Sequence, residues 1–497
     1  MKMKSFKQKG SALIFALIFL LILSVMGASL MFLSQSETWS GMNYKMMTQT
    51  RYGAEAGINA AANYLMYTYT PPASTTAFNT SVYPVTDLAG NNIKLSSIPG
   101  ISANYPNSGI RSAFNSATNS HAAGTTLTAG PAQVNYTASA QLMAMAQVTP
   151  FGSTTPLTVQ TWQITAHGDM TGVRTAESEV SAVLERQVSP TFAFAAFATG
   201  GGCGALSFTG NGTTDSYDSG SIAVAASGAA TGSPTFQNFA GNVGTNGNQS
   251  DSGNNVQIYG SLSTPRVGVG SCTAGNVTAL SGSSTQISGG IIELPQAINL
   301  PLPTIPSPGT TNINSSTNLC NPLALVLVPP CTSTATGPAG LYGDINLAGN
   351  DVVGLYPGTY NINSVSVSGN ASIVILPDPV TGLYGPVIIN VAGNNNATPI
   401  TLTGNGFSNP TYDSTMLQLN YAGSGTIKVA GNGASAAVVY APGAAISFKG
   451  NGAFYGAVIG NTVSDVGNGA IHYDRKLQRK LFTVGNYMLS SFSWSKY

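Results

Sequence analysis

The sequence predicts an α+β fold that is mostly β: a long N-terminal helix, then a small antiparallel sheet, then a C-terminal parallel β-helix, or solenoid. Three observations lead to this prediction. Residues 11–36 carry no charged side chain, residues 133–188 alternate apolar and polar side chains, and a short Gly-Asn unit recurs from Phe208 onward. Period-two alternation is typical of strands, and a recurring short unit is typical of stacked repeats.

The composition favours strands and turns over disorder. Only 7% of the 497 residues are charged, 43% are hydrophobic, and 58 are glycine. Disordered chains are rich in charge and poor in β-branched residues, whereas here Val, Ile and Thr alternate with Gly and Asn. Between Gln187 and Ala470 the basic residues are Arg266, Lys428 and Lys449, against nine acidic ones. No cationic surface is then available to neutralise phosphates, so we expect no nucleic-acid partner.

The N-terminal apolar segment is long enough to cross a bilayer as a helix, with residues 11–34 as the membrane part. Because lysines precede this segment and none lies within it, the amino end is expected in the cytoplasm and the rest outside. A secretory signal has a shorter apolar run, and a plain single-pass anchor explains the hydropathy equally well; both alternatives stay open. The preceding lysines are Lys2, Lys4, Lys7 and Lys9.

The helical pattern continues beyond the membrane part as far as Tyr67. Apolar and small residues recur there at steps of three and four, which marks one packing face. The small residues, which let neighbouring helices approach closely, are Gly41, Gly53, Ala54, Ala56 and Gly57.

The first 65 residues or so resemble a known family. The leader that ends in Lys9-Gly10, the run SALIFALIFLLIL from Ser11, and RYGAEAGINAA over residues 51–61 are similar to the N-terminus of PilX-type minor pilins and pseudopilins. The resemblance implies cleavage after Gly10 by a prepilin peptidase, N-methylation of Ser11, and packing of the helix against other pilin or pseudopilin subunits. Phe15 stands where major pilins carry a glutamate, which indicates a minor or initiating subunit.

The candidate residues of the membrane and filament helix are Phe15, Gly27, Glu37 and Glu55. Residues 1–10 are the expected leader, and residues 11–67 are the expected helix.

For residues 68–190 we predict a pilin-like head region with antiparallel strands. Residues 70–128 indicate loops with a short helix, and residues 133–148 and 158–170 alternate like strands. Residues 175–188 fit either a helix or a strand, and the alternation around Val180 favours a strand.

Residues 191–474 predict the Gly-Asn-rich β-helix. In the last third of the chain the Gly-Asn pairs lie 11 to 27 residues apart. Gly accepts positive φ freely and Asn tolerates it, so the pair turns the chain between short strands, and Asn side chains of successive turns can share hydrogen bonds. A β-sandwich is the competing fold. Residues 436–474 resemble the β-helical domain that follows PilX-type N-termini in large bacterial surface proteins, and residues 475–497 are expected to cap the last turn.

The cysteines are Cys203, Cys272, Cys320 and Cys331, and none lies in a CxxC pair. If the chain is exported, disulfides can form, and four cysteines allow three pairings. The most local pairing joins Cys203 to Cys272 and Cys320 to Cys331, and four buried thiols are the alternative.

The sequence offers little for catalysis. It has three histidines, and the nearest acidic pairs, Asp215 with Asp218 and Asp344 with Asp351, are explained by turn capping. We therefore expect no enzyme, no cofactor and no metal, with calcium bound through scattered Asp and carbonyl oxygens as an open alternative.

The expected function is that of a minor pilus or pseudopilus subunit that displays a solenoid for surface adhesion or filament initiation. It would start in the inner membrane and end at the cell surface. The expected partners are the prepilin peptidase, other pilin subunits, the membrane, and glycans or neighbouring cells. A β-helical carbohydrate-active enzyme that uses the leader for export, and a structural scaffold of the filament, are the alternatives.

Overall fold

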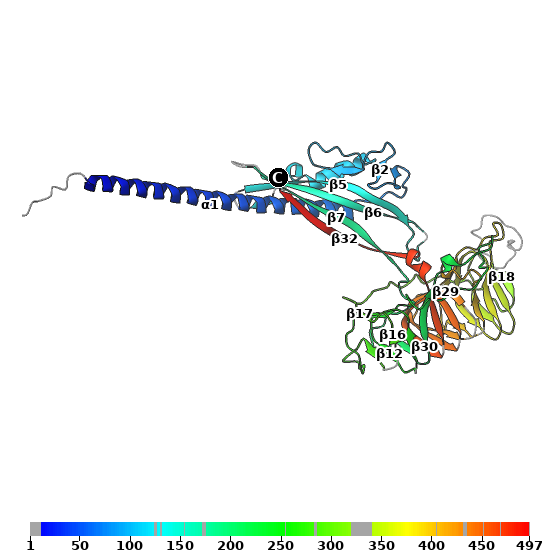
Figure 1. Ribbon diagram of the computed structural model, residues 1–497. Helices are drawn as coiled ribbons and strands as arrows, with labels where there is room; N and C mark the ends of the chain where they lie inside the picture. The colour runs from blue at the N-terminus through cyan, green and yellow to red at the C-terminus, as the bar shows by residue number, and fades with distance from the viewer. Residues whose placement is uncertain are drawn as a thin grey trace, which may run out of the picture. The chain divides into compact units, whose positions relative to one another are not determined.

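The computed structural model of the chain divides into two compact units. Unit 1 comprises Met1–Val188 and Val484–Tyr497, and unit 2 comprises Ser189–Thr483. Figure 1 shows unit 1 around the blue helix and unit 2 in green, yellow and orange. The structure describes residues 11–123, 127–129, 132–153, 155–170, 175–253, 255–282, 286–319, 340–403, 405–430, 435–450, 452–467 and 469–496.

Unit 1 combines one long helix with an antiparallel sheet. The sheet has the strand order β3-β5-β6-β7-β32, with β4 paired to β5. Its elements are α1 (Ser11–Asn63), a π-helical turn (Tyr64–Thr68), β1 (Phe78–Asn79), β2 (Thr86–Asp87), β3 (Lys94–Ser96), α2 (Ser108–Thr118), α3 (Ser120–Ala123), β4 (Leu127–Ala129), β5 (Ala132–Val148), β6 (Leu157–Met170), β7 (Ala176–Pro190) and β32 (Phe482–Lys496). Residues 176–190 form a strand, so the strand predicted for residues 175–188 is confirmed and the alternative helix is not.

The second half of α1 lies against β5 and β6 at backbone distance. A Cβ on Gly168 of β6 would come within 2.0 Å of the Thr50 carbonyl oxygen, and one on Gly57 within 2.8 Å of the Ala166 Cβ. Only glycine fits where two backbones approach this closely. Gly53, Ala54 and Gly57 of the sequence pattern thus serve the contact between this helix and its own sheet.

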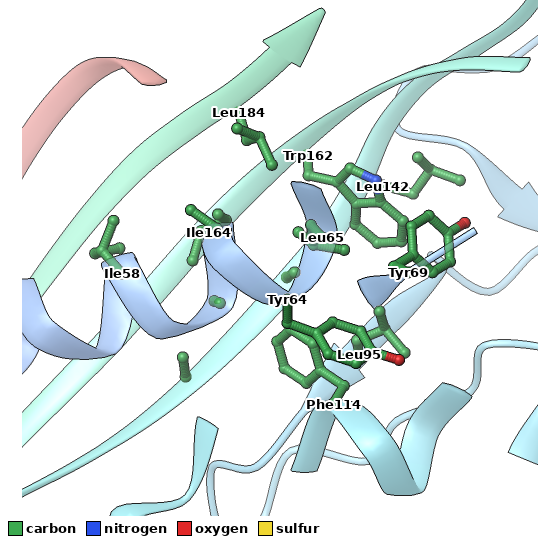
Figure 2. Close-up of a cluster of buried hydrophobic side chains, with 14 of the residues drawn as sticks. Ile58, Tyr64, Leu65, Tyr69, Leu95, Phe114, Leu142, Trp162, Ile164 and Leu184 are labelled. Atoms are coloured by element: carbon green, nitrogen blue, oxygen red, sulfur yellow. The ribbon is translucent and has the colours of Figure 1, made fainter. Parts of the chain in front are cut away.

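The core of unit 1 forms between α1 and the inward face of that sheet (Figure 2). Burial alternates along β6, so Trp162, Ile164 and Ala166 face the helix and the residues between them face outward. The Tyr69 hydroxyl donates to the Gln160 side chain over 2.9 Å, and the same amide oxygen accepts from the Trp162 indole over 3.2 Å. These three buried polar groups are therefore paired with one another.

The C-terminal segment differs from the predicted cap of residues 475–497. Only Arg475–Arg479 forms a short 3-10 turn, while Phe482–Lys496 is β32, an edge strand of the unit 1 sheet. Its partly buried Tyr487 and Leu489 pack against the unit 1 core, which explains why the segment joins this sheet. The Arg186 guanidinium donates to the Gly485 carbonyl oxygen of β32 over 2.9 Å. Unit 2 is thus an insertion between two neighbouring strands, β7 and β32.

Gly168→Ala tests the close approach of helix and sheet. We expect the added methyl group to lower the free energy of unfolding of unit 1 by about 3 kcal/mol, because overpacking displaces one backbone from the other. Urea unfolding of the detergent-solubilised protein, followed by tryptophan fluorescence, measures the change. Gly41→Ala is the matched control, since no atom lies within 4 Å of a Cβ at that position. Equal stability of the two variants would contradict the packing described.

Unit 2 consists of short strands joined by turns. Its strands form one 20-stranded sheet and one 4-stranded sheet with the order β18-β20-β23-β26. The elements are β8 (Ala196–Ala198), β9 (Leu206–Phe208), β10 (Thr213–Tyr217), η2 (Ser219–Ser221), β11 (Val243–Thr245), β12 (Gln249–Asp251), β13 (Gln257–Ile258), β14 (Leu262–Thr264), β15 (Leu280–Ser281), β16 (Gln286–Ile287), β17 (Ile291–Glu293), β18 (Thr317–Leu319), β19 (Asp344–Leu347), β20 (Val352–Leu355), β21 (Gly358–Ile362), β22 (Ser364–Val367), β23 (Ser372–Ile375), β24 (Val387–Val391), β25 (Ile400–Leu402), β26 (Gly406–Ser408), η3 (Ser414–Met416), β27 (Leu417–Tyr421), β28 (Thr426–Ala430), β29 (Ser435–Gly450), β30 (Ala453–Gly467), β31 (Ala470–Asp474) and η4 (Arg475–Arg479).

The strands of both sheets pair in parallel. β19 pairs with β22, β22 with β25, and β25 with β28, so each partner lies 20 to 35 residues further along the chain. Apolar side chains of successive partners occupy one buried row: Leu347, Val367 and Leu402 pair in register. The body of the protein is therefore largely β with parallel sheets, as predicted. We call this series of paired strands the stack.

The chain enters and leaves the stack in its middle. From β8 it runs outward to β17, and the part from β19 to β31 runs back towards the middle. There β31 pairs with β10, and β30 pairs with both β8 and β9. We call these three pairings the seam, residues 192–293 the first half and residues 340–474 the second half. In Figure 1 the orange β30 lies beside the green strands of the first half, and β18 lies at the far end.

An extended segment, residues 294–312, leads from the end of the first half towards the far end of the stack. Asn246 holds it near β11, where its side chain bonds both the Ile298 nitrogen and the Ile298 carbonyl oxygen. Further along, the Tyr440 hydroxyl donates to the Pro301 carbonyl oxygen over 2.6 Å. The two halves of the stack are thus linked outside the seam by a strap that follows its surface.

The Gly-Asn units lie at stacked turns. A Cβ on Gly210 would come within 1.6 Å of the Gly467 carbonyl oxygen, and one on Gly253 within 1.8 Å of the Gly210 carbonyl oxygen. At these two positions the glycine is therefore required by backbone contact between neighbouring turns. Asparagines also bond along the stack: the Asn390 amide donates to Asn361, and the Asn420 amide to Asn390, over 2.9 and 3.0 Å. These Asn ladders stabilise the stacking of successive strands.

Candidate functional site

The first half of α1 is an exposed apolar surface. Its side chains from Ala12 to Tyr44 are solvent-exposed, and 67% of the Phe15 side chain is accessible. By length and composition the helix Ala12–Thr68 qualifies as a membrane span, and its most apolar window has a mean hydropathy of 2.8. An apolar surface of this size on a soluble protein needs a partner or a membrane.

The predicted helix residues lie on two parts of α1. Phe15 and Gly27 belong to the exposed apolar part, and Gly27 has no neighbouring atom within 4 Å of a Cβ. Glu37 follows on the exposed surface, and Glu55 accepts from the Arg51 guanidinium over 2.8 Å within the helix. Gly10 lies outside the described residues, and Ser11 is the first residue of α1.

The surroundings of the helix change near Thr50, where it begins to pack on the sheet. The Thr50 hydroxyl is fully buried and lies 2.7 Å from the Ser178 hydroxyl of β7, with which it shares a hydrogen bond. From Gly53 onward the inward face of the helix is covered by the sheet. One continuous helix thus has a second half that packs on the sheet and a first half that the sheet leaves exposed.

Cys203 and Cys272 form a disulfide in unit 2. It joins the turn before β9 to the loop before β15, so it closes the first half of the stack on itself. This is the local pairing expected from the sequence, and its predicted companion, Cys320 with Cys331, lies outside the described residues.

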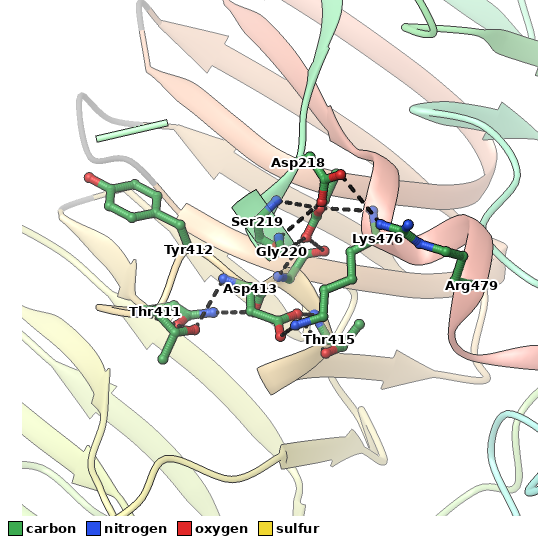
Figure 3. A network of polar contacts seen from close by, with 12 residues as sticks. Asp218, Ser219, Gly220, Thr411, Tyr412, Asp413, Thr415, Lys476 and Arg479 are labelled. Atoms are coloured by element: carbon green, nitrogen blue, oxygen red, sulfur yellow. Dashed lines mark hydrogen bonds and ion pairs between the residues drawn. The ribbon is translucent and has the colours of Figure 1, made fainter. Parts of the chain in front are cut away.

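A polar network surrounds the point where the chain leaves the stack (Figure 3). Three short turns, η2, η3 and η4, each begin after a Tyr-Asp pair whose Asp caps the turn: Asp218 accepts from Gly220 N, Asp413 from Thr415 N, and Asp474 from Lys476 N. An Asp at this position satisfies a turn's free backbone donor. The repeated Tyr-Asp pair is the sequence signal that could have indicated the network, and the sequence reasoning above missed it.

Asp474 is the centre of this network. Its side chain is 0% exposed and accepts hydrogen bonds from the Ser219 hydroxyl at 2.7 Å and the Ser414 hydroxyl at 3.0 Å. Burial raises the pKa of the Asp474 carboxyl, while its hydrogen bonds with Ser219 lower it. Lys476 Nζ lies 2.5 Å from Asp413 Oδ2. Asp474 therefore joins η2 of the first half to η3 of the second.

The acidic pairs considered for catalysis serve separate local contacts. Asp218 caps η2, whereas Asp215 contacts the imidazole of His472. Asp344 accepts from the Ser364 hydroxyl over 2.6 Å, and Asp351 from the Ser316 hydroxyl over 3.3 Å. Within the part of the chain that the structure describes, no group of three or more His, Cys, Asp and Glu side chains is arranged to hold a metal ion.

Two family models match the chain. Residues 9–59 match the family described as PilX N-terminal, and residues 344–480 match a domain of unknown function, DUF7305. The first match confirms the resemblance: the N-terminal segment of the chain is that of a type IV minor pilin. The second spans β19 to η4 and includes almost only the second half of the stack.

Among curated proteins, none matches the chain. Among solved structures, the crystal structure of the competence-associated pilin ComZ from Thermus thermophilus is similar over 91% of this chain and 98% of that one, with 14% identity. Its TM-score of 0.25 is too low to indicate a shared overall fold.

Asp474→Ala tests the polar network. We expect it to lower the free energy of unfolding of unit 2 by about 3 kcal/mol, because the Ser219 and Ser414 donors lose a buried charged acceptor. Thermal unfolding followed by circular dichroism measures the change. Asp378→Ala is the matched control, because Asp378 caps an exposed turn in the same way, accepting from Val380 N and Thr381 N. If both variants lose the same stability, Asp474 acts only as a turn cap.

Proposed function

We propose that this chain is a minor subunit of a type IV pilus or pseudopilus, made as a membrane-inserted prepilin and then moved outward, with unit 2 displayed at the cell surface. One observation carries the proposal: a single helix is apolar and uncovered over its first half and packed on its own sheet over its second. Fully burying one large apolar side chain is worth about 2 kcal/mol, so this half is stable only inside a bilayer or against other helices. A filament of pilin helices provides that cover.

Processing by a prepilin peptidase belongs to this proposal. The basic leader ends at Gly10, and α1 begins at Ser11, so cleavage after Gly10 would leave the whole helix in the mature subunit. Phe15 in place of an acid removes a charge from the membrane part and supports a minor rather than a bulk subunit.

Mass spectrometry of the mature N-terminus tests the processing. We expect a terminal peptide that starts with N-methylated Ser11, and Gly10→Val should preserve the intact leader by blocking cleavage. Recovery of a chain that starts at Met1 in the wild-type protein would reduce the proposal to a membrane-anchored surface protein.

We further propose that the stack is a parallel β-helix. Its support is the pairing of strands about one circuit apart, the in-register rows of Val, Ile and Leu inside, and the Gly-Asn turns in backbone contact. A β-sandwich would need antiparallel neighbours in its sheets, whereas the paired strands of unit 2 are parallel.

Unit 2 would then serve adhesion. Its exposed side chains include many Thr, Ser and Asn residues and few charges, which suits many weak polar contacts to glycans or to neighbouring cells, and a filament multiplies such contacts. A non-enzymatic role is part of this proposal, because the carboxylates of the acidic pairs named above make contacts within unit 2.

Deleting residues 189–483 tests the role of unit 2. Since β7 and β32 are neighbouring strands, a short turn can rejoin Val188 to Val484 and leave unit 1 complete. We expect filaments to assemble while adhesion of cells to surfaces is lost. The measurements are subunit incorporation into sheared filaments and counts of attached cells. Loss of filament assembly would favour the scaffold role. Unchanged adhesion would show that unit 2 has no part in adhesion.

A further inference from the structure

The seam brings together chain segments that are far apart in sequence. Thr213–Tyr217 pairs with Ala470–Asp474, and Leu206–Phe208 pairs with Val463–Asp465. The disulfide lies within the first half and does not cross the seam. The family match to residues 344–480 ends on the same line, since it covers β19 to η4 and none of β8 to β17. The seam is thus a boundary between two separately paired halves.

Buried carboxyl and imidazole groups concentrate at this boundary. Among the residues that the structure describes, they are Asp215, Asp251, Asp413, Asp465, His472 and Asp474. Four of them belong to the seam strands themselves: Asp215 to β10, Asp465 to β30, and His472 and Asp474 to β31. Burying an ionisable group costs free energy unless the group is paired or neutral. The seam therefore carries this cost, and no disulfide of the described residues joins the two halves across it.

Asp465 is the clearest case. Its side chain is 3% exposed and points into the row between its register partners Phe208 and Phe448, and among the described residues neither carboxyl oxygen has a hydrogen-bond partner. The turn glycines Gly212 and Gly469 lie against it, where a Cβ would come within 2.7 and 2.8 Å of its oxygens. These neighbours include no charged group. Burial raises the pKa of the Asp465 carboxyl to about 6.

The other ionisable groups of the seam face partners. Asp474 faces Ser219 and Ser414, with Asp413 beyond them raising its pKa further. His472 contacts the Asp215 carboxylate, and the ring of Phe236 stacks on its imidazole at a centroid distance of 3.9 Å. The hydrogen bonds of Asp474 and the contact of His472 with Asp215 hold the seam closed, whereas Asp465 opposes closure once it is ionised. The raised pKa of Asp474 adds to the pH dependence in the same direction.

We propose that the seam is a proton-sensitive joint: unit 2 opens between residues 192–217 and 453–474 while each half stays paired, and opening becomes easier as the pH rises from acidic to neutral.

The direction follows from linkage. In the closed seam the Asp465 pKa lies near 6, above its ordinary value of 3.8, so the closed state holds the proton more tightly than the open one. Closure is therefore most favourable below pH 3.8, weakens as the pH rises towards about 6, and then levels off. Between pH 5 and pH 7.5 the closing equilibrium constant should fall about tenfold.

Hydrogen exchange of the full-length protein in detergent tests the joint. After correction for the intrinsic pH dependence of exchange, peptides that cover β9, β10, β30 and β31 should lose about tenfold in protection between pH 5 and pH 7.5. Peptides that cover β21 and β24, inside the second half, should keep theirs. Equal loss across unit 2, or no loss at the seam, would overturn the proposal.

Two substitutions at Asp465 separate the joint from general stability. Asp465→Asn should reduce the pH dependence at the seam to the part that Asp474 contributes, and Asp465→Val, which matches the Val429 of the same row, should also raise protection at pH 7.5. Asp378→Asn is the matched control and should leave the profile unchanged. An undiminished pH dependence of the seam in both Asp465 variants would overturn the assignment to this carboxyl.

A covalent lock completes the test. Ser207 and Ser464 are register partners across the seam and half-buried, so Ser207→Cys with Ser464→Cys offers a disulfide between the halves. The oxidised variant should keep its seam protected at pH 7.5, and reduction should restore opening. If the oxidised and reduced forms exchange alike, the seam is not where unit 2 opens.

Discussion

Unit 2 must begin and end at neighbouring points, because the strands that flank it, β7 and β32, are neighbours in the sheet of unit 1. A stack of parallel strands that starts at one end and finishes at the other has its termini a full stack length apart. This chain meets the constraint by starting and finishing in the middle of the stack and by running a strap along its surface. The seam, the strap and the two free ends of the stack all follow from that one requirement.

The same constraint explains where the polar network lies. The Tyr-Asp turns join the first half, the second half and the departing chain at the place where no covalent connection holds the halves together. Directional hydrogen bonds with buried carboxylates fix the register there, and apolar rows alone would allow one half to slip along the other. Burying these carboxylates costs free energy, but their hydrogen bonds specify one register between the two halves.

Part of this architecture could be predicted from the sequence. The uncharged run from Ser11 and the alternation around Trp162 and Val180 gave the helix and the antiparallel strands, because local periodicity reports burial directly. The Gly-Asn pairs indicated turns between strands, and the structure adds that their glycines, such as Gly210 and Gly467, touch backbone to backbone.

Other features could not be predicted, because periodicity says which residues share a face but not which circuits are neighbours. The pairing of β10 with β31 joins residues some 257 positions apart, as the contact of Asp215 with His472 shows. The segment from Phe482 follows a basic run, which suggested a cap, and its true partner is a strand some 300 residues earlier. Asp465 lies beside a Gly-Asn turn, so its burial in an apolar row has no local signal.

The position of the seam also sets the order in which the molecule can be completed. β8, β9 and β10 are synthesised more than 200 residues before the strands that cover their second edge, and unpaired parallel edges invite pairing with any available strand. Contacts of such long sequence separation form slowly. During its synthesis the chain therefore carries an open edge for a long interval, which closes only when β31 arrives.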